Sequence, residues 1–403
     1  MCDCTRVDRI SDCIASLREE MAAFTGELVS VATENPPGNH LERCAELLIG
    51  KLRQIGIEPS VHTHRDDEDR VWPSILAFYG SGERTLYFHG HYDVVPAQSP
   101  SQFEPIRRVD HLFGRGSGDM KSGLAAKIYA VRALQMSGIE LNGRIGLTFV
   151  PDEETGGRNG SARLAAWGLL GANGIGMLTA EPTGGVVWNA CRGAISIAIT
   201  VKGKTAHAGL ECRGVNAFEK MIEVAEALRA LKREAAGRRT QFSISPDAAR
   251  SSILMMGGEC RSGTGFNVVP DECRFTIDRR INPEEDLKAE KARLIEVLEG
   301  QRKRGIELEY VILQEGEAAG TDSKEPLARA LAQSVEKVAG KTPVFEMCPG
   351  LLETRFYSAR GIPALAYGPG MLSVAHGPHE FVSLDAVASC ARVYAMTAAQ
   401  MLT

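Results

Sequence analysis

Apolar residues recur at three- and four-residue steps near the start of the chain, which predicts one face of a long amphipathic helix that ends near residues 35–38. The positions with this spacing are Val7, Ile10, Ile14, Leu17, Met21, Phe24 and Leu28. From there to about residue 190, helical stretches such as 121–136 alternate with short apolar runs at 86–88, 145–150 and 177–178. This alternation predicts an α/β sheet covered by helices on both faces.

The pattern changes near residue 192. Isoleucines at 195, 197 and 199 alternate with Ser196, Ala198 and Thr200, which indicates a strand with one solvent-exposed face, as in an antiparallel sheet. Helices near 216–231 and 284–298 and strands near 252–256, 273–277 and 307–312 complete a β-α-β-β-α-β order, typical of a ferredoxin-like unit. Helix and strand alternate again after Pro326. We therefore predict an α/β domain formed by residues 1–190 and 314–403, with a smaller α+β domain inserted at 191–313.

Length and composition exclude several classes of protein. A chain of 403 residues is longer than one hydrophobic core usually serves, which agrees with two domains. Lys and Arg number 46 against 51 Asp and Glu, without a basic stripe, so nucleic acid is not an expected partner. No apolar run approaches the roughly 18 residues of a membrane span. Ten cysteines without a C-x-x-C pair, and no apolar signal segment, predict reduced thiols in the cytoplasm, with Cys2 and Cys4 as surface thiols.

Acidic and histidine side chains follow several of the predicted strands, where open α/β sheets place ligand sites. His91 and Asp93 lie two residues apart on extended chain and point the same way, so Asp93 can hold one ring nitrogen while the other meets a metal. A His–Asp pair that stabilises a turn is the alternative.

A glycine-rich segment at 114–121 runs into a predicted helix and places Asp119 at the helix start. A helix cap and a phosphate cradle are the competing interpretations. The phosphate loop fails, because its Gly-Lys-Ser/Thr ending is absent.

Glu153 and Glu154 follow the predicted strand at 145–150 and project in opposite directions. One can bind a metal while the other acts as general base toward a metal-bound water, although a solvated acidic turn gives the same pattern. Glu181 follows the run at 177–178, and His376 and His379 lie in a later loop.

Two histidines and three carboxylates converging without a cation would leave the carboxylates repelling one another. The set therefore favours more than one divalent metal ion. Mixed nitrogen and oxygen ligands suit zinc, with cobalt or manganese as alternatives.

Five motifs together make the chain recognisable: GHYDVVP, GRGSGDMKSG, PDEETGG, TAEPT and AHGPHEF. The sequence resembles, over nearly its whole length, the acetylornithine deacetylase, succinyl-diaminopimelate desuccinylase and glutamate carboxypeptidase family of dinuclear zinc hydrolases. The resemblance implies a mixed-sheet, zinc-peptidase-like catalytic domain with an inserted ferredoxin-like dimerisation, or lid, domain. It further implies two divalent metal ions, with ligands distributed as follows: His91 and Glu181 on one ion, Glu154 and His376 on the other, and Asp119 on both.

The resemblance also implies roles for residues that do not bind metal. Asp93 orients His91, and Glu153 takes a proton from the shared water and hands it to the leaving nitrogen. In the inserted domain, His207 lies in the segment KTAHAG and corresponds to a histidine that reaches the neighbouring subunit's active site and steadies the oxyanion, which implies a homodimer. Asn267 and Arg280 resemble substrate-facing positions, with Arg280, or its neighbour Arg279, as a carboxylate anchor.

Three departures from the family pattern concern the substrate. Leu351 and Leu352 replace small hydroxyl residues, His379 stands where Asn or Asp is usual, and His89 adds a second ring before His91. The leucines favour a flatter, more apolar substrate, or they pack into the sheet.

We therefore predict a metal-dependent hydrolase that removes the acyl group from an N-acyl amino acid, a small-molecule substrate. The alternatives are hydrolysis of another C–N bond, either aromatic amine deamination or carboxypeptidase or dipeptidase action, and a non-catalytic relative that keeps the fold as a binding module. The complete ligand set, with Glu153 present, argues against the last.

Overall fold

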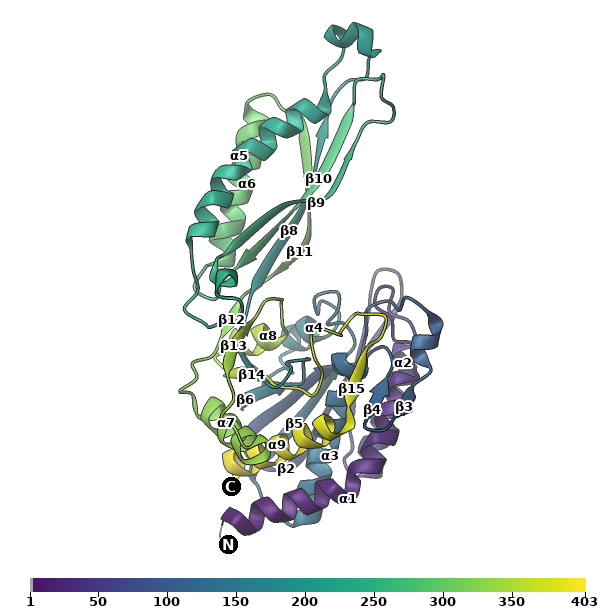
Figure 1. Ribbon diagram of the computed structural model, residues 1–403, viewed down its shortest axis with the longest axis vertical. Coiled ribbons are helices and arrows are strands. Elements are labelled where there is room, and N and C mark those ends of the chain that lie inside the picture. Colours follow the sequence, from purple (N-terminus) through teal and green to yellow (C-terminus); the bar gives the residue numbers. More distant parts are fainter. Residues whose placement is uncertain (1–2) are drawn as a thin grey trace. The chain divides into compact units, whose positions relative to one another are not determined.

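The computed structural model describes residues 3–403, and side-chain environments from residue 7 onward. The predicted surface thiols at Cys2 and Cys4 thus lie outside the described side chains. By its internal contacts the chain divides into two compact units. The large unit comprises residues up to Asn189, Gly320–Glu346 and Glu353–Thr403, and the small unit comprises Ala190–Ala319 and Met347–Leu352. Both are drawn in Figure 1.

The large unit contains an eight-stranded mixed sheet with the order β1-β2-β6-β14-β7-β12, in which β5 pairs with β2 and β13 with β7. β6 lies parallel to β2 and β14, whereas β1 pairs antiparallel with β2 and β7 antiparallel with β14. The mixed sheet confirms the predicted fold class. The strand bounds are Ser60–Arg65 (β1), Val71–His91 (β2), Asn142–Val150 (β5), Gly174–Thr179 (β6), Val187–Cys191 (β7), Ala319–Gly320 (β12), Phe345–Cys348 (β13) and Ala364–Ala366 (β14).

Side chains of β2 alternate between two apolar clusters, because successive residues of a strand face opposite sides of a sheet. Leu86 and Phe88 belong to the main core, and Tyr87 belongs to a second cluster. The main core is formed with α1, α2, α3, α7 and α9, and the second with α4 and α8, so helices cover both faces as predicted. Their bounds are Asp3–Val29 (α1), Leu41–Gln54 (α2), Ser122–Ser137 (α3), Ser161–Ala166 (α4), Pro326–Ala339 (α7), Thr354–Ser358 (α8) and Leu384–Leu402 (α9).

The predicted opening helix is present as α1, but it ends at Val29, earlier than the predicted end near residues 35–38. The apolar positions of its stripe from Ile10 to Leu28 are buried, and Val7 packs against the same core. In Figure 1, α1 crosses the base of the large unit beside α3 and α9, and it contacts both.

A second, three-stranded sheet in the large unit has the order β15-β4-β3 and is antiparallel. Its strands are Ile106–Arg108 (β3), His111–Phe113 (β4) and Phe381–Ser383 (β15). Phe381 pairs with Phe113, so the chain shortly after His376 runs beside the chain shortly before Asp119. The small sheet thereby brings together two loops that are far apart in sequence.

The small unit is a four-stranded antiparallel sheet with the order β11-β8-β10-β9, packed against α5 and α6. In chain order the elements are β8 (Gly193–Lys202), α5 (Ala217–Gly237), β9 (Ile253–Ser262), β10 (Glu272–Ile281), α6 (Leu287–Lys303) and β11 (Leu308–Gly316). This is the predicted ferredoxin-like order. Ile195, Ile197 and Ile199 are fully buried in the core of this unit.

Within residues 3–403, we find no helix that is both long enough and apolar enough to cross a lipid bilayer.

Candidate metal-binding active site

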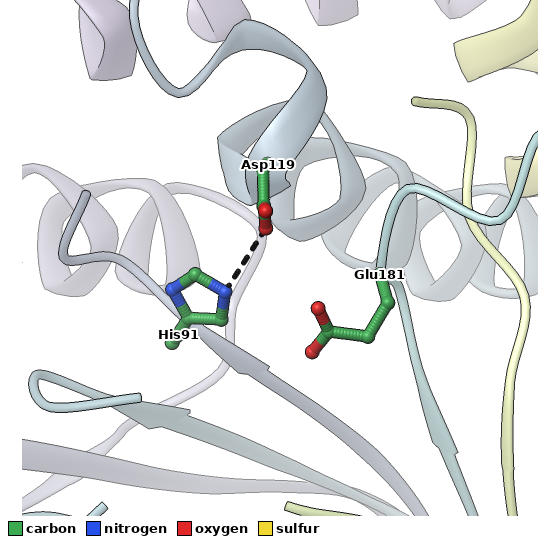
Figure 2. A group of neighbouring side chains, drawn as sticks. All are labelled: His91, Asp119 and Glu181. Atoms are coloured by element: carbon green, nitrogen blue, oxygen red, sulfur yellow. Dashed lines mark ion pairs between the residues drawn. The ribbon is translucent and has the colours of Figure 1, made fainter. Parts of the chain in front are cut away.

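Three predicted ligands meet at the ends of two neighbouring strands of the large unit. His91 is the last residue of β2, Glu181 follows β6, and Asp119 lies in the tight turn before α3. One ligand atom from each of the three lies within 4.8 Å of the others, and all three side chains are buried. Figure 2 shows the imidazole of His91 below Asp119, with the carboxylate of Glu181 directed toward the same space.

A second group consists of Asp119, Glu154 and His376, whose ligand atoms also lie within 4.8 Å of one another. His376 Nε2 is 3.2 Å from Asp119 Oδ2 and 3.4 Å from Glu154 Oε2. The other oxygen of Asp119, Oδ1, is 3.3 Å from His91 Nε2. The two oxygens of Asp119 therefore face different groups, and the structure brings all five predicted ligands together.

Two buried atoms at this centre, His91 Nε2 and Asp119 Oδ1, lie 3.3 Å apart as an ion pair, yet neither makes a hydrogen bond with any described residue. Buried polar atoms without partners are rare in native proteins and costly. Imidazole nitrogen and carboxylate oxygen are ligands that zinc, cobalt and manganese accept. The donor set thus fits divalent cations, and Asp119 belongs to both candidate groups.

The fully buried Asp93 contacts both the acidic loop and the ring of His91. Its Oδ1 accepts a hydrogen bond from the backbone N–H of Glu153 at 3.1 Å, and its Oδ2 accepts one from the N–H of Glu154 at 3.1 Å. His91 Nδ1 lies 3.3 Å from Asp93 Oδ1 and 3.1 Å from the Asp93 carbonyl oxygen. Asp93 therefore contacts the His91 ring and also fixes the loop that carries both glutamates.

Asn35 is a supporting residue that the sequence analysis missed. Its side-chain amide donates to Asp93 Oδ2 at 2.9 Å and to Asp152 Oδ1 at 3.0 Å. Asn35 follows α1 and stands directly before two prolines, a rigid segment that was the only signal available in the sequence.

Burial and close carboxylates shift the proton affinities of the centre. Burial raises the pKa of Glu181 to about 8. Burial, reinforced by the charge of Glu181, raises the pKa of Glu153 well above its usual value. The carboxylates of Asp119 and Glu154 raise the pKa of His376 to about 10. Protons and divalent cations therefore compete for these side chains.

The extra histidine, His89, lies in a separate buried pair. Its Nε2 is 2.6 Å from Glu353 Oε2, with exposed fractions of 0% and 1%, and its Nδ1 is 3.2 Å from the hydroxyl of Tyr357. Arg355, two residues after Glu353, donates to the carbonyl of Gly156 at 2.7 Å. The segment that departs from the family pattern thus holds the end of β2 and the acidic loop.

Of the predicted substrate-binding residues, His379 is exposed in the large unit, and the others lie in the small unit. Asn267 is exposed and Leu351 half-buried, whereas Leu352 is 4% exposed, as its packing alternative predicts. His207 is also exposed, and its Nδ1 accepts a hydrogen bond from the N–H of Gly209.

The two neighbouring arginines of β10 differ sharply. Arg279 is 1% exposed and pairs with Glu285 and Glu290 inside the small unit. Arg280 is half-buried and pairs with Asp278 at 2.9 Å. Between the two candidate anchors, Arg280 is the one whose guanidinium reaches the surface of its unit.

Comparison with known proteins gives a consistent result. A sequence model of peptidase family M20/M25/M40 matches residues 87–400. The succinyl-diaminopimelate desuccinylase of Thioalkalivibrio sulfidiphilus is 27% identical over 87% of this chain and 91% of its own. The aminoacylase-1 of Sus scrofa is 29% identical over 74% of each chain.

Two solved structures show the same fold. The di-peptidase Dug1p of Saccharomyces cerevisiae has a TM-score of 0.78 at 16% identity over 98% of each chain. The YXEP protein of Bacillus subtilis, a dinuclear metal binding peptidase, has a TM-score of 0.67 at 15% identity over 96% of this chain and 99% of its own.

Proposed function

The chain belongs to peptidase family M20/M25/M40, whose members are metal-dependent hydrolases of amide C–N bonds, and we propose that it removes the acyl group from an N-acyl amino acid. The observation that carries the proposal is the position of Asp119, whose two oxygens face His91 on one side and His376 on the other. The similarity to a desuccinylase and to an aminoacylase supports acyl transfer to water.

In this proposal five side chains hold two divalent metal ions, with zinc favoured and manganese or cobalt as alternatives. His91 and Glu181 would hold one ion, Glu154 and His376 would hold the other, and Asp119 would belong to both sets of ligands. When bound, such ions acidify a water molecule and polarise the amide carbonyl. Asp93 keeps the His91 ring oriented through Nδ1, and its carboxylate holds the main chain of the acidic loop.

Glu153 is the proposed general base. Its backbone N–H is anchored on Asp93. Burial of its carboxyl, followed by the charges of Glu181 and Glu154, raises its pKa and favours the protonated form. The carboxylate accepts a proton from the attacking water and then, as an acid, donates it to the leaving nitrogen. A raised pKa suits the second step, because the carboxyl then keeps the proton until the leaving nitrogen takes it.

Glu153→Gln tests this role. It preserves the shape of the side chain and should leave metal content unchanged, while kcat falls by about 10²- to 10⁴-fold. Asp110→Asn is the control, because Asp110 pairs with Arg18 and Ser383 and is no part of the proposed machinery. Wild-type turnover in the Glu153 variant would contradict its assignment as base.

The proposed substrate contacts are the carboxylate anchor Arg280, together with Asn267 and His379, and Leu351 and Leu352 as apolar contacts. The runner-up reactions are aromatic amine deamination and dipeptidase or carboxypeptidase action, which the leucines motivate. A panel of N-acyl amino acids, dipeptides and aromatic amines separates them. Release of a free carboxylic acid supports deacylation, and release of ammonia supports deamination.

We further propose that residues 191–313 form a dimerisation domain and that His207 completes the site of the partner subunit. Exposed apolar side chains support this: Phe218 and Ile222 lie one turn apart on α5, and Ile253 and Met255 lie on the edge strand β9. α5 and β9 contact each other, and β9 is the edge strand, so a second copy can pair along β9 beside α5. Phe218→Asp should convert a dimer to a monomer in analytical ultracentrifugation.

Mixing two inactive variants tests the role in trans. Glu153→Gln and His207→Ala each abolish every site of their own homodimer. In a mixed dimer, one site combines an intact Glu153 with an intact His207 from the other subunit. Random exchange at equal amounts should therefore restore about a quarter of wild-type activity. No recovery after verified subunit exchange would contradict the proposal.

A further inference from the structure

A buried ion pair joins the two loops that carry Asp119 and His376. Arg115 Nη1 lies 2.6 Å from Glu380 Oε2, and the two side chains are 1% and 0% exposed. Arg115 precedes the turn with Asp119, and Glu380 follows the loop with His376. We call Arg115 and Glu380 the loop clamp.

Each member of the loop clamp also binds the main chain of the opposite loop. Glu380 Oε1 accepts hydrogen bonds from the N–H of Gly118 at 2.9 Å and of Asp119 at 3.0 Å. Arg115 Nη2 donates to the carbonyl oxygen of His376 at 3.1 Å. The backbone of both candidate ligands is therefore fixed to a single pair of charges.

The two groups of candidate metal ligands differ in the other contacts that hold them in place. His91 and Glu181 directly follow the pairing of buried strands, and Asp93 holds the His91 ring. The side chain of His376, by contrast, is 49% exposed, and its φ of 62° lies in the left-handed region, which non-glycine residues rarely adopt. Such a conformation persists where neighbouring contacts impose it, and Arg115 supplies one at the carbonyl.

We propose that the loop clamp sets the separation of Asp119 and His376, and so controls the affinity for the cation at the Asp119–Glu154–His376 group more than at the His91–Asp119–Glu181 group. This inference rests on the proposed two-metal function. An ion pair that merely filled the interior would add little over apolar side chains of the same volume. Both side chains of the loop clamp also form hydrogen bonds with the main chain of the loops that carry the ligands. The pair therefore positions the ligands, as residues just outside the ligand set of a metal site commonly do.

The test is a metal titration of the full-length protein with zinc and with cobalt, followed by calorimetry and by the visible absorption of bound cobalt. Wild type should bind two ions. Arg115→Met and Glu380→Gln should lower the affinity for the ion at the Asp119–Glu154–His376 group by about 10- to 100-fold. The affinity for the ion at the His91–Asp119–Glu181 group should stay at the wild-type value. Arg115→Lys retains the charge but not the fork of donors, so it should give an intermediate loss.

Arg18→Met is the matched control, because Arg18 pairs with Asp110 and Asp385 in the same unit. It should leave both binding steps unchanged. If Arg115→Met does not fold, the Arg115→Lys isotherm decides alone.

The outcomes separate this inference from the proposed function. Wild type that binds no divalent ion would overturn the proposed function itself. Two ions in wild type with unchanged binding in the variants would overturn the loop clamp. An equal loss of affinity for both ions would also overturn the loop clamp, because that result indicates a general loss of structure.

Discussion

Asp93→Asn offers a quantitative test of how the candidate site is held together. The change replaces one carboxylate oxygen with an NH₂ group that cannot accept a hydrogen bond. Oδ1 accepts from the N–H of Glu153, and Oδ2 accepts from the N–H of Glu154 and from Asn35. In either orientation of the new amide, at least one glutamate N–H loses its acceptor and faces a second donor.

The expected size follows from these contacts. A hydrogen bond to a buried charged group contributes about 1.5–3 kcal/mol, and an unsatisfied buried donor costs a similar amount. A loss of about 3 kcal/mol should lower the Tm of the large unit by roughly 5 °C. A loop displaced by about 1 Å should lower kcat/KM by about 100-fold, since Glu153 and Glu154 lie on it.

Thermal unfolding and steady-state kinetics on the metal-loaded protein measure both effects, with Asp110→Asn as the control. Asp110 also accepts several hydrogen bonds, from Arg18, Ser383 and the N–H of Asp385. The control should lose stability without the fall in kcat/KM. A folded Asp93→Asn protein with wild-type kcat/KM would refute the reasoning.

Three further predictions follow from other parts of the structure. Removal of divalent cations by a chelator should lower the Tm, since the clustered carboxylates then repel one another, and zinc, manganese or cobalt should restore it; an unchanged Tm would contradict the metal site. Partial burial alone would raise the pKa of Asp66, but hydrogen bonds from Arg70 and Trp72 lower it to about 2. Because this folded pKa lies below the unfolded one, Asp66 stabilises the metal-free protein above about pH 4 and loses that effect toward pH 2. Asp66→Asn should thus lower the Tm at pH 7. A Tm difference from wild type that is as large at pH 2 as at pH 7 would contradict this prediction. Leu352→Ala should destabilise the protein by about 2–4 kcal/mol in denaturant titrations, whereas Leu351→Ala should not; equal effects would show that burial does not separate the two.

Long periodic elements could be predicted from the sequence, and short ones could not. The stripe of α1 and the strand and helix order of the small unit follow from local periodicity. β2 is 21 residues long, yet only its apolar run at 86–88 was predicted. The strands β3, β4 and β15 have three residues each, too few for a period to register.

The candidate ligands were predictable because each stands in a motif beside a predicted strand or helix. Apart from Asp93, the residues that support the ligands were not predictable, because the partners are remote in sequence. Arg115 and Glu380 are 265 residues apart, and His89 and Glu353 are 264 residues apart. No local pattern links such residues, and only the folded chain shows that Glu380 binds the main chain of Asp119.

The order of strands in the large sheet has a consequence for biosynthesis. β14 lies between β6 and β7, yet it is translated only after the entire small unit. A nascent chain that has already emerged through β7 therefore presents an open slot, with the edge of β6 unpaired, for as long as the intervening residues are being added. Exposed strand edges can pair with other chains, so during this interval the nascent chain exposes a site for self-association.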